Sequence, residues 1–284
     1  SSDVCSSDLL PIHADLRDFL DLFQTKLAGT CLPSFEHWRS WGRAIEKELP
    51  TLFDDNPSIP EYISSYVFAD ELFKQLREGD VVVTGNGTAY TSTYQAMKVN
   101  RGVRVFANQG CAAMGYDLPA AIGAAIANGK GRTILVTGDG SVQMNIQELQ
   151  TLLTYRIPLK VFILENQGYL AIKTTQQSFF QGHYIGSDPG SGVVCPDMEK
   201  IANAYGIPFV RLNQEGNSLK SSIAAVLQYE GAYICEIKMH PLQTLYPKSA
   251  SFMDKNGKMS SAPLEKMAPF MSDELQEKCI YCHI

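Results

Sequence analysis

The stretch "TILVTGDGS", residues 133–141, places a carboxylate where an apolar segment ends. Residues 133–136 are β-branched or apolar, which is typical of a buried strand. Asp139 then follows between Gly138 and Gly140. A lone carboxylate at a buried strand end is unfavourable unless another group compensates its charge. The stretch therefore predicts a strand that ends in a ligand-binding turn.

Similar apolar runs alternate with helical patterns along most of the chain. Predicted strands cover six ranges: 81–84, 103–107, 133–137, 159–164, 209–212 and 233–239. Predicted helices cover 61–77, 89–98, 117–128, 144–155, 198–205 and 217–229. Because the strands are apolar throughout, we expect them to be buried on both faces in a parallel sheet. The predicted fold class is α/β, a three-layer parallel sheet with helices on both faces.

The chain before the first strand has a different character. Apolar residues recur at helical spacing over 16–27, and a second helix is expected over 36–48. The Pro- and Asp-rich stretch 50–60 is typical of a linker. We therefore predict a non-native tail, a helical remnant of a preceding domain with its linker, a sheet domain and an irregular C-terminal arm, at residues 1–9, 10–55, 56–245 and 246–284.

Composition excludes several classes of protein. The 284-residue chain carries a net charge of -6 and has a pI near 5.4. This acidity, with no Lys/Arg-rich run, argues against a nucleic-acid partner. No apolar run approaches the roughly eighteen residues of a membrane span, and no signal peptide is evident. We therefore expect a cytoplasmic protein with no membrane partner.

The seven cysteines are scattered, as is usual for reduced thiols. "CIYCH", residues 279–283, has the spacing of a c-type haem attachment motif. No pocket-forming sequence follows it, and a tetrahedral zinc site would need another ligand from elsewhere. Neither haem nor zinc is expected there.

A second polar residue follows the next predicted strand. Asn166 comes 27 residues after Asp139, which is the length of one right-handed crossover from strand to strand. If the two strands are neighbours, both side chains lie at the carboxyl edge of the sheet, where ligands bind. Carboxylate and amide oxygens suit Mg²⁺ or Ca²⁺. A simple tight turn would explain Gly-Asp-Gly alone, but the spacing to Asn166 favours a metal site.

The same turn has features of a phosphate site. Gly138 and Gly140 let the backbone approach a phosphate, and Ser141 adds a hydroxyl. A helix expected to begin near Val142 would direct its positive end to the same place. Because Mg²⁺ usually shares its site with phosphates, the sequence predicts a Mg²⁺-diphosphate site.

These motifs resemble those of thiamine diphosphate-dependent enzymes of the acetolactate synthase-like family. Gly-Asp-Gly followed some two dozen residues later by Asn resembles the family's cofactor signature. "GYDLPAAIGAAIA" at 115–127, Met114 before it, "GNG" at 85–87 and the closing "APLEKMAPF" also resemble parts of these enzymes. The resemblance extends from about residue 10 to 270. The sequence departs from the pattern in two places: Glu165 replaces the first Asn of an Asn-Asn pair, and Thr88-Ala89 replaces a polar pair.

The resemblance implies roles for individual residues. Asp139, the Asn166 side chain and the main-chain oxygen of Gly168 would bind the metal. Met114 would press against the cofactor and hold it in its bent form. The residues expected at the cofactor are Gly87, Thr88, Met114, Gly138, Gly140, Ser141, Gly168 and Tyr169.

The resemblance also implies an activity, the decarboxylation or carboligation of a 2-keto acid such as pyruvate. The family's catalytic glutamate lies in a pyrimidine-binding domain that precedes the segment seen here. We therefore expect this chain to supply the diphosphate and metal half of the site. The other half would come from upstream sequence or another subunit, in a homo-oligomer. FAD binding stays open.

Two other functions remain as alternatives. One is a non-catalytic subunit that binds thiamine diphosphate. The other is a nucleotide-binding Rossmann-type enzyme, although "GNGTAY" at 85–90 lacks the third glycine of that motif. The polar and aromatic stretch 174–186 is predicted to be a loop that either lines the substrate channel or covers the sheet edge.

Overall fold

The computed structural model describes residues 12–49, 61–213, 217–246, 251–253, 259–261, 267 and 273–279. The chain divides into two compact units, and the division falls after Glu48. The predicted tail, the linker 50–60 and most of the predicted arm lie outside the described residues, as do Cys282 and His283 of the "CIYCH" motif. Within the described ranges, no helix has both the length and the apolar character that a membrane crossing requires.

The first unit contains two helices, α1 (Leu16–Leu27) and α2 (Glu36–Glu48), which match the predicted ranges. α1 begins where the Asp15 side chain accepts a hydrogen bond from the Arg17 backbone N–H at 2.8 Å. This bond satisfies one of the free N–H groups of the first turn. No residue of either helix is buried, so the described part of this unit, residues 12–48, forms no apolar core.

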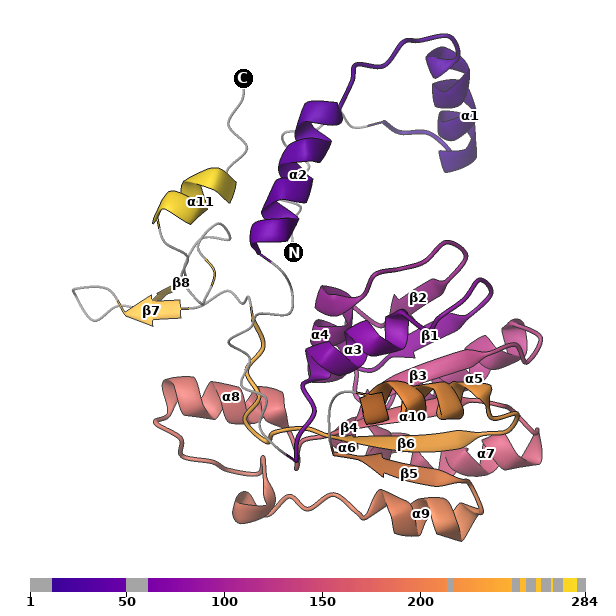
Figure 1. The fold of residues 1–284 in the computed structure, drawn as a ribbon, viewed down its shortest axis with the longest axis vertical. Helices are drawn as coiled ribbons and strands as arrows, with labels where there is room; N and C mark the ends of the chain where they lie inside the picture. The colour runs from indigo at the N-terminus through magenta and orange to yellow at the C-terminus, as the bar shows by residue number, and fades with distance from the viewer. Residues whose placement is uncertain are drawn as a thin grey trace. The chain divides into compact units, whose positions relative to one another are not determined.

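The second unit contains the six predicted strands in one parallel sheet (Figure 1). The strands are β1 (Val81–Thr84), β2 (Arg104–Ala107), β3 (Thr133–Gly138), β4 (Lys160–Glu165), β5 (Phe209–Leu212) and β6 (Tyr233–Lys238). Their order is β2-β1-β3-β4-β6-β5. Because β2 and β3 lie on opposite sides of β1, the strand order reverses between β1 and β3. In open parallel sheets, ligands bind at such a point, beyond the carboxyl ends of the strands.

Helices cover both faces of this sheet, which confirms the predicted three-layer architecture (Figure 1). One face packs against α3 (Ser65–Phe73), α4 (Thr88–Ala96) and α10 (Asn217–Gln228). The other packs against α5 (Asp117–Ala127), α7 (Leu149–Thr154) and α9 (Met198–Tyr205). Successive residues of each strand alternate between the two apolar clusters, as the pleat of a doubly covered strand requires.

The helix predicted over 144–155 is wrong in its start and its continuity. The structure has a short helix α6 (Asp139–Val142), a 3₁₀ segment η1 (Gln143–Glu148) and then α7. Asn145 interrupts the helical backbone, with φ -138° and ψ 35°. Its side-chain Nδ2 donates to the Gly115 oxygen at 2.7 Å. The helical segment therefore begins at Asp139 itself and not near Val142.

The loop predicted over 174–186 is also wrong in part, because α8 (Leu170–Phe179) extends well into it. Thr174, Thr175 and Ser178 are poor helix formers, so the local sequence favoured a helix only weakly here. Two buried residues in the first turn, Leu170 and Lys173, anchor this helix to the rest of the domain. In the predicted irregular arm, the described residues form a strand pair, β7 (Ser251–Met253) with β8 (Met259–Ser261), and a helix α11 (Asp273–Cys279).

Candidate functional site

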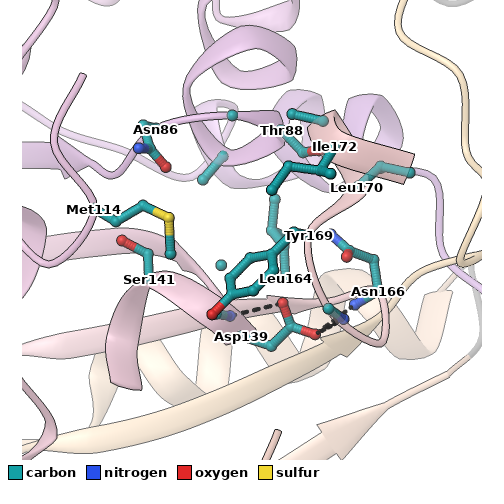
Figure 2. A pocket seen from close by; sticks show the side chains of 16 residues that line it. Asn86, Thr88, Met114, Asp139, Ser141, Leu164, Asn166, Tyr169, Leu170 and Ile172 are labelled. Atoms are coloured by element: carbon teal, nitrogen blue, oxygen red, sulfur yellow. Dashed lines mark hydrogen bonds between the residues drawn. The ribbon is translucent and has the colours of Figure 1, made fainter. Parts of the chain in front are cut away.

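A cavity of about 160 Å³ lies beyond the carboxyl ends of β1, β3 and β4 (Figure 2). Its lining comes from the turns after these strands and from the first turn of α8. Met114, in the segment that leads into α5, also lines it. The cavity therefore lies where the strand order of the sheet reverses. All the site residues predicted from the sequence lie around it: Gly87, Thr88, Met114, Gly138, Asp139, Gly140, Ser141, Asn166, Gly168 and Tyr169.

Asp139 is only 2 % exposed, and backbone N–H groups surround its carboxylate. Oδ2 accepts hydrogen bonds from Asn166 N at 3.2 Å and from Gly168 N at 3.0 Å. Oδ1 accepts from Gly140 N at 2.8 Å. Burial still raises the pKa of Asp139, although these three hydrogen bonds and the nearby Lys173 act to lower it. The surrounding protein thus compensates the charge incompletely, and an additional cation would stabilise the carboxylate.

Asn166 is 4 % exposed, and its side-chain oxygen Oδ1 is buried without a hydrogen-bond partner among the described residues. A buried polar atom without a partner is costly, and one in a native fold calls for an explanation. Because Asn166 lines the same cavity as Asp139, a cation bound there would supply the missing partner.

Gly168 is placed by a contact that only glycine allows. Its φ is +120°, and a Cβ atom at this position would lie 2.4 Å from the Ser187 backbone oxygen. The loop after β4 therefore passes close to the backbone of residue 187 and keeps the Gly168 N–H on Asp139. The role of the Gly168 carbonyl as a metal ligand stays a prediction.

These donors fit a hard divalent cation. No cluster of three or more His, Cys, Asp or Glu side chains suited to a metal occurs in the described part of the chain. A cation in the cavity would therefore be held by one carboxylate together with amide and backbone oxygens. Mg²⁺ accepts such a set, because it usually takes one or two carboxylates and completes its shell with water and phosphate oxygens. Asp139, Asn166 and Gly168 would be the residues that hold it.

Glu165, where the family pattern has asparagine, takes part in the same loop. Its Oε1 accepts from Gln167 N at 3.0 Å, whereas its Oε2 is buried with no partner among the described residues. Burial raises the pKa of Glu165, and the neighbouring carboxylates of Asp139 and Glu236 raise it further. The substitution adds an acidic group beside the predicted metal site.

The residues predicted to contact a diphosphate lie on the β1 and β3 sides of the cavity. Gly87 precedes α4 with φ +56°, a conformation that favours glycine, and Thr88 opens that helix. Ser141 Oγ accepts a hydrogen bond from Gly115 N at 3.0 Å. This bond ties the Gly-Asp-Gly turn to the segment that carries Met114, so the predicted phosphate and cofactor-bending residues are held together.

Met114 and Tyr169 extend into the cavity from different elements (Figure 2). Met114 is 36 % exposed, so the residue is partly accessible. The Tyr169 ring lies against the Gly-Asp-Gly turn: a Cβ atom added to Gly140 would be 2.5 Å from Tyr169 Cε1. Glycine at 140 thus leaves the space that the ring fills.

Several residues in or near the site were not identified from the sequence. Asn86 lines the cavity and its Nδ2 donates to the Ala112 oxygen, which fixes the segment before Met114. Its position between two glycines at a strand end was a usable signal. Asp117, fully buried, accepts a hydrogen bond from the Thr137 hydroxyl. Its proximity to β3 depends on how α5 packs, which no local pattern reveals. The cavity wall also includes Ala89, Leu164, Leu170, Ala171 and Ile172.

Comparison with known proteins agrees with this geometry. Residues 85–237, more than half of the chain, match the family model described as "Thiamine pyrophosphate enzyme, C-terminal TPP binding domain". The chain belongs to this family of thiamine diphosphate-dependent enzymes, which confirms the predicted family and the predicted cofactor thiamine diphosphate; Mg²⁺ stays a prediction. The match covers every site residue discussed above.

Among individual relatives, the chain is similar to acetolactate synthases. It is 37% identical over 248 residues to the acetolactate synthase large subunit of Cyanidium caldarium, covering 85% of this chain and 40% of that protein. It is 30% identical over 257 residues to the chloroplastic acetolactate synthase 1 of Zea mays, covering 86% and 39%. The chain thus spans about two fifths of the length of these relatives. Because the maize relative is chloroplastic, the cytoplasmic location stays a prediction.

A solved structure supports the fold. The thiamine diphosphate-dependent 4-hydroxybenzoylformate decarboxylase of Rhodococcus jostii RHA1 superposes with a TM-score of 0.57 at 20% sequence identity. The superposition covers 66% of this chain and 35% of that one.

Proposed function

We propose that this chain provides the diphosphate- and Mg²⁺-binding half of an acetolactate synthase-like active site. The reaction would be the decarboxylation or carboligation of a 2-keto acid such as pyruvate. The single observation that carries the proposal is the convergence of Asp139 and Asn166 on one cavity, with the Asn166 side-chain oxygen buried and unpartnered. The similarity to acetolactate synthases supports the substrate class.

Bound thiamine diphosphate supplies the nucleophilic carbon and the electron sink for this chemistry. The chain's own residues bind and orient. Asp139, Asn166 and Gly168 would hold the cation, while Gly87, Thr88 and the Gly138–Ser141 turn would hold the diphosphate. Met114 would support the cofactor through a flexible thioether contact.

A second protein part is needed to close the site. The cavity of about 160 Å³ is smaller than the roughly 300 Å³ or more of pockets that enclose most of a small ligand. We propose that a pyrimidine-binding domain, from upstream sequence or another copy in a homo-oligomer, covers the rest and supplies the catalytic glutamate. Water exclusion would then depend on that contact.

Calorimetric titration with thiamine diphosphate, with and without Mg²⁺, tests the binding function. We expect binding that requires Mg²⁺. The variant Asp139→Asn should weaken it by about 10-fold or more, since it removes the charged ligand. Asn203→Ala, on the exposed side of α9, serves as the control and should bind like the unsubstituted chain. Binding that is equally strong without Mg²⁺ would contradict the metal part of the proposal.

CO₂ release from pyruvate, measured with a pyrimidine-binding domain added or fused upstream, tests the catalytic part. We expect release only when both parts are present. Mg²⁺-dependent binding without turnover of any 2-keto acid would favour the alternative of a non-catalytic cofactor-binding subunit. Absence of thiamine diphosphate binding would reopen the nucleotide-binding alternative.

A further inference from the structure

Lys173 is a buried lysine that contacts the loop after β4, and the proposed function gives it no role. It lies in the first turn of α8 and is 1 % exposed. Its Nζ donates to the backbone oxygen of Asn166 at 2.7 Å and lies 3.5 Å from that of Gln167. Burying a lysine is costly unless its ammonium is well partnered. Its partners here belong to the loop that carries the predicted metal ligands.

We propose that Lys173 is a positioning residue that holds the loop 165–168 in the conformation that binds Mg²⁺ and the diphosphate. This inference rests on the proposed function of the site. It gives α8 a role in cofactor binding, because Lys173 on this helix would position the loop that carries Asn166.

The loop is held by three charged side chains from three elements. The N–H groups of Asn166 and Gly168 donate to Asp139, the first residue of α6, and the N–H of Gln167 donates to Glu165, the last residue of β4. The oxygens of Asn166 and Gln167 face Lys173 on α8. Carboxylates therefore fix three successive N–H groups, and one ammonium faces two carbonyl oxygens. Without Lys173, those two oxygens would lose their charged partner, and each peptide plane would be held only through its N–H group.

Rotation of these planes would affect the metal ligands directly. The Asn166 side chain and the Gly168 backbone extend from the same peptide units that Lys173 contacts. Gly168 has little freedom to adapt, because its φ of +120° and its approach to the Ser187 oxygen restrict its backbone. A change at the Asn166 and Gln167 carbonyls would therefore move Asn166 Oδ1 relative to Asp139. Groups that orient metal ligands typically contribute about 10- to 100-fold to metal affinity.

A different role for Lys173, charge neutralisation, predicts the opposite change in Mg²⁺ affinity when the lysine is removed. The Lys173 ammonium lies near the carboxylates of Asp139, Glu165 and Asp188 and near the thiol of Cys195. If it only neutralised these carboxylates, its removal would leave more negative charge at the site and would strengthen Mg²⁺ binding. If it positions the loop, its removal weakens binding. The direction of the change thus separates the two roles.

The test compares Lys173→Met, Lys173→Arg and Lys160→Met by titration with Mg²⁺ at saturating thiamine diphosphate. Lys160 is a matched control: it is 2 % exposed, and its Nζ donates to the backbone oxygens of Tyr229 and Gly231. It lies at the start of β4, whereas the cavity lies at the end of that strand. We expect Lys173→Met to weaken Mg²⁺ binding about 10-fold or more. Lys173→Arg keeps the positive charge and should retain most of the Mg²⁺ affinity. Lys160→Met should leave the affinity unchanged.

A second measurement needs no cofactor. Amide hydrogen exchange at residues 166–168 reports whether the loop N–H groups remain on Asp139 and Glu165. We expect Lys173→Met to speed exchange at these amides about 10-fold relative to the β3 and β4 amides, and Lys160→Met not to do so. This readout remains informative if Lys173→Met lowers overall stability, because β3 and β4 provide the internal reference.

Unchanged or tighter Mg²⁺ binding in Lys173→Met, with unchanged exchange at 166–168, would overturn the inference and leave the proposed function intact. Equal weakening in Lys160→Met would also overturn it, because the effect would then follow from any lost buried lysine. If the unsubstituted chain does not bind Mg²⁺ and thiamine diphosphate, the proposed function fails, and the inference fails with it.

Discussion

The Asp139 carboxylate lies 3.2 Å from the Asn166 backbone nitrogen, although 27 residues separate the two positions in the chain. Neighbouring parallel strands produce this contact, because β3 and β4 pair in register from Ile134 with Lys160 to Gly138 with Leu164. Each residue follows directly at the end of its strand. The parallel ladder thus places a carboxylate and an amide at one edge of the sheet.

Removal of the Asp139 side chain should destabilise the fold even without a cofactor. Asp139→Ala leaves the buried N–H groups of Gly140, Asn166 and Gly168 without their acceptor. We expect the free energy of unfolding to fall by about 2 to 4 kcal/mol. This is less than the summed cost of three unsatisfied N–H groups, because the substitution also removes a buried charge. Urea denaturation measures it. Glu230→Ala, at an exposed position after α10, should change stability by less than about 0.5 kcal/mol.

Gly168→Ala and Gly186→Ala separate steric overlap from backbone strain. Both glycines have positive φ, but a Cβ at Gly168 meets the Ser187 oxygen at 2.4 Å, whereas a Cβ at Gly186 meets nothing within 4 Å. Gly186→Ala should cost about 1 kcal/mol, and Gly168→Ala clearly more, about 2 kcal/mol or above. Denaturation midpoints of both variants check the order. Equal costs would mean that the loop moves away from residue 187 easily.

Two buried threonines should respond differently to valine. The Thr137 hydroxyl donates to the buried Asp117 carboxylate, so Thr137→Val should cost about 2 kcal/mol. The Thr84 hydroxyl is buried with no partner among the described residues, so Thr84→Val should be neutral or stabilising. Thermal or chemical denaturation of the pair provides the comparison. A larger loss in Thr84→Val would show that its hydroxyl has a partner in solution.

The lowered pKa of Lys160 predicts that the protein becomes more stable as the pH rises above neutral. Burial, together with the nearby charge of Arg132, lowers its pKa from 10.5 to about 8. Between these two values the unfolded chain binds more protons than the folded chain, so the free energy of unfolding increases with pH. The gain approaches about 3 kcal/mol if the whole shift applies. Unfolding should be measured at pH 7.5 and 10 in the unsubstituted chain and in Lys160→Met.

The comparison with Lys160→Met isolates this contribution, because the tyrosine and cysteine side chains titrate in both proteins. The unsubstituted chain should gain stability relative to the variant as the pH rises. An unchanged difference between the two proteins at both pH values would mean that Lys160 keeps an ordinary pKa, held charged by the Tyr229 and Gly231 oxygens.

The sequence predicted the sheet well because each strand is a short apolar run that both layers of helices bury. All six strands were placed within about one residue of their ends, and the Asp139–Asn166 relationship followed from one crossover length. The break between α6 and α7 was not predictable, because it occurs where Asn145 hydrogen-bonds to the distant Gly115 oxygen. α8 was missed because Leu170 and Lys173 stabilise it through tertiary contacts, and local propensity does not.

The candidate site could be predicted from the sequence only in part. Residues within motifs, such as Gly87 and Ser141, could be assigned by position. Lys173 and Asp117 could not, because each acts through a neighbour that is close only in the folded chain. Charged residues in a helix are usually exposed, so sequence alone gave no reason to place Lys173 beneath the metal loop.

The most direct test of the central claim is a crystal structure of the chain with thiamine diphosphate and Mn²⁺, which is visible by anomalous scattering and can replace Mg²⁺. The account predicts one anomalous peak within about 2.2 Å of both an Asp139 carboxylate oxygen and Asn166 Oδ1, in contact with the diphosphate. A bound cofactor whose metal lies away from these two atoms would contradict it.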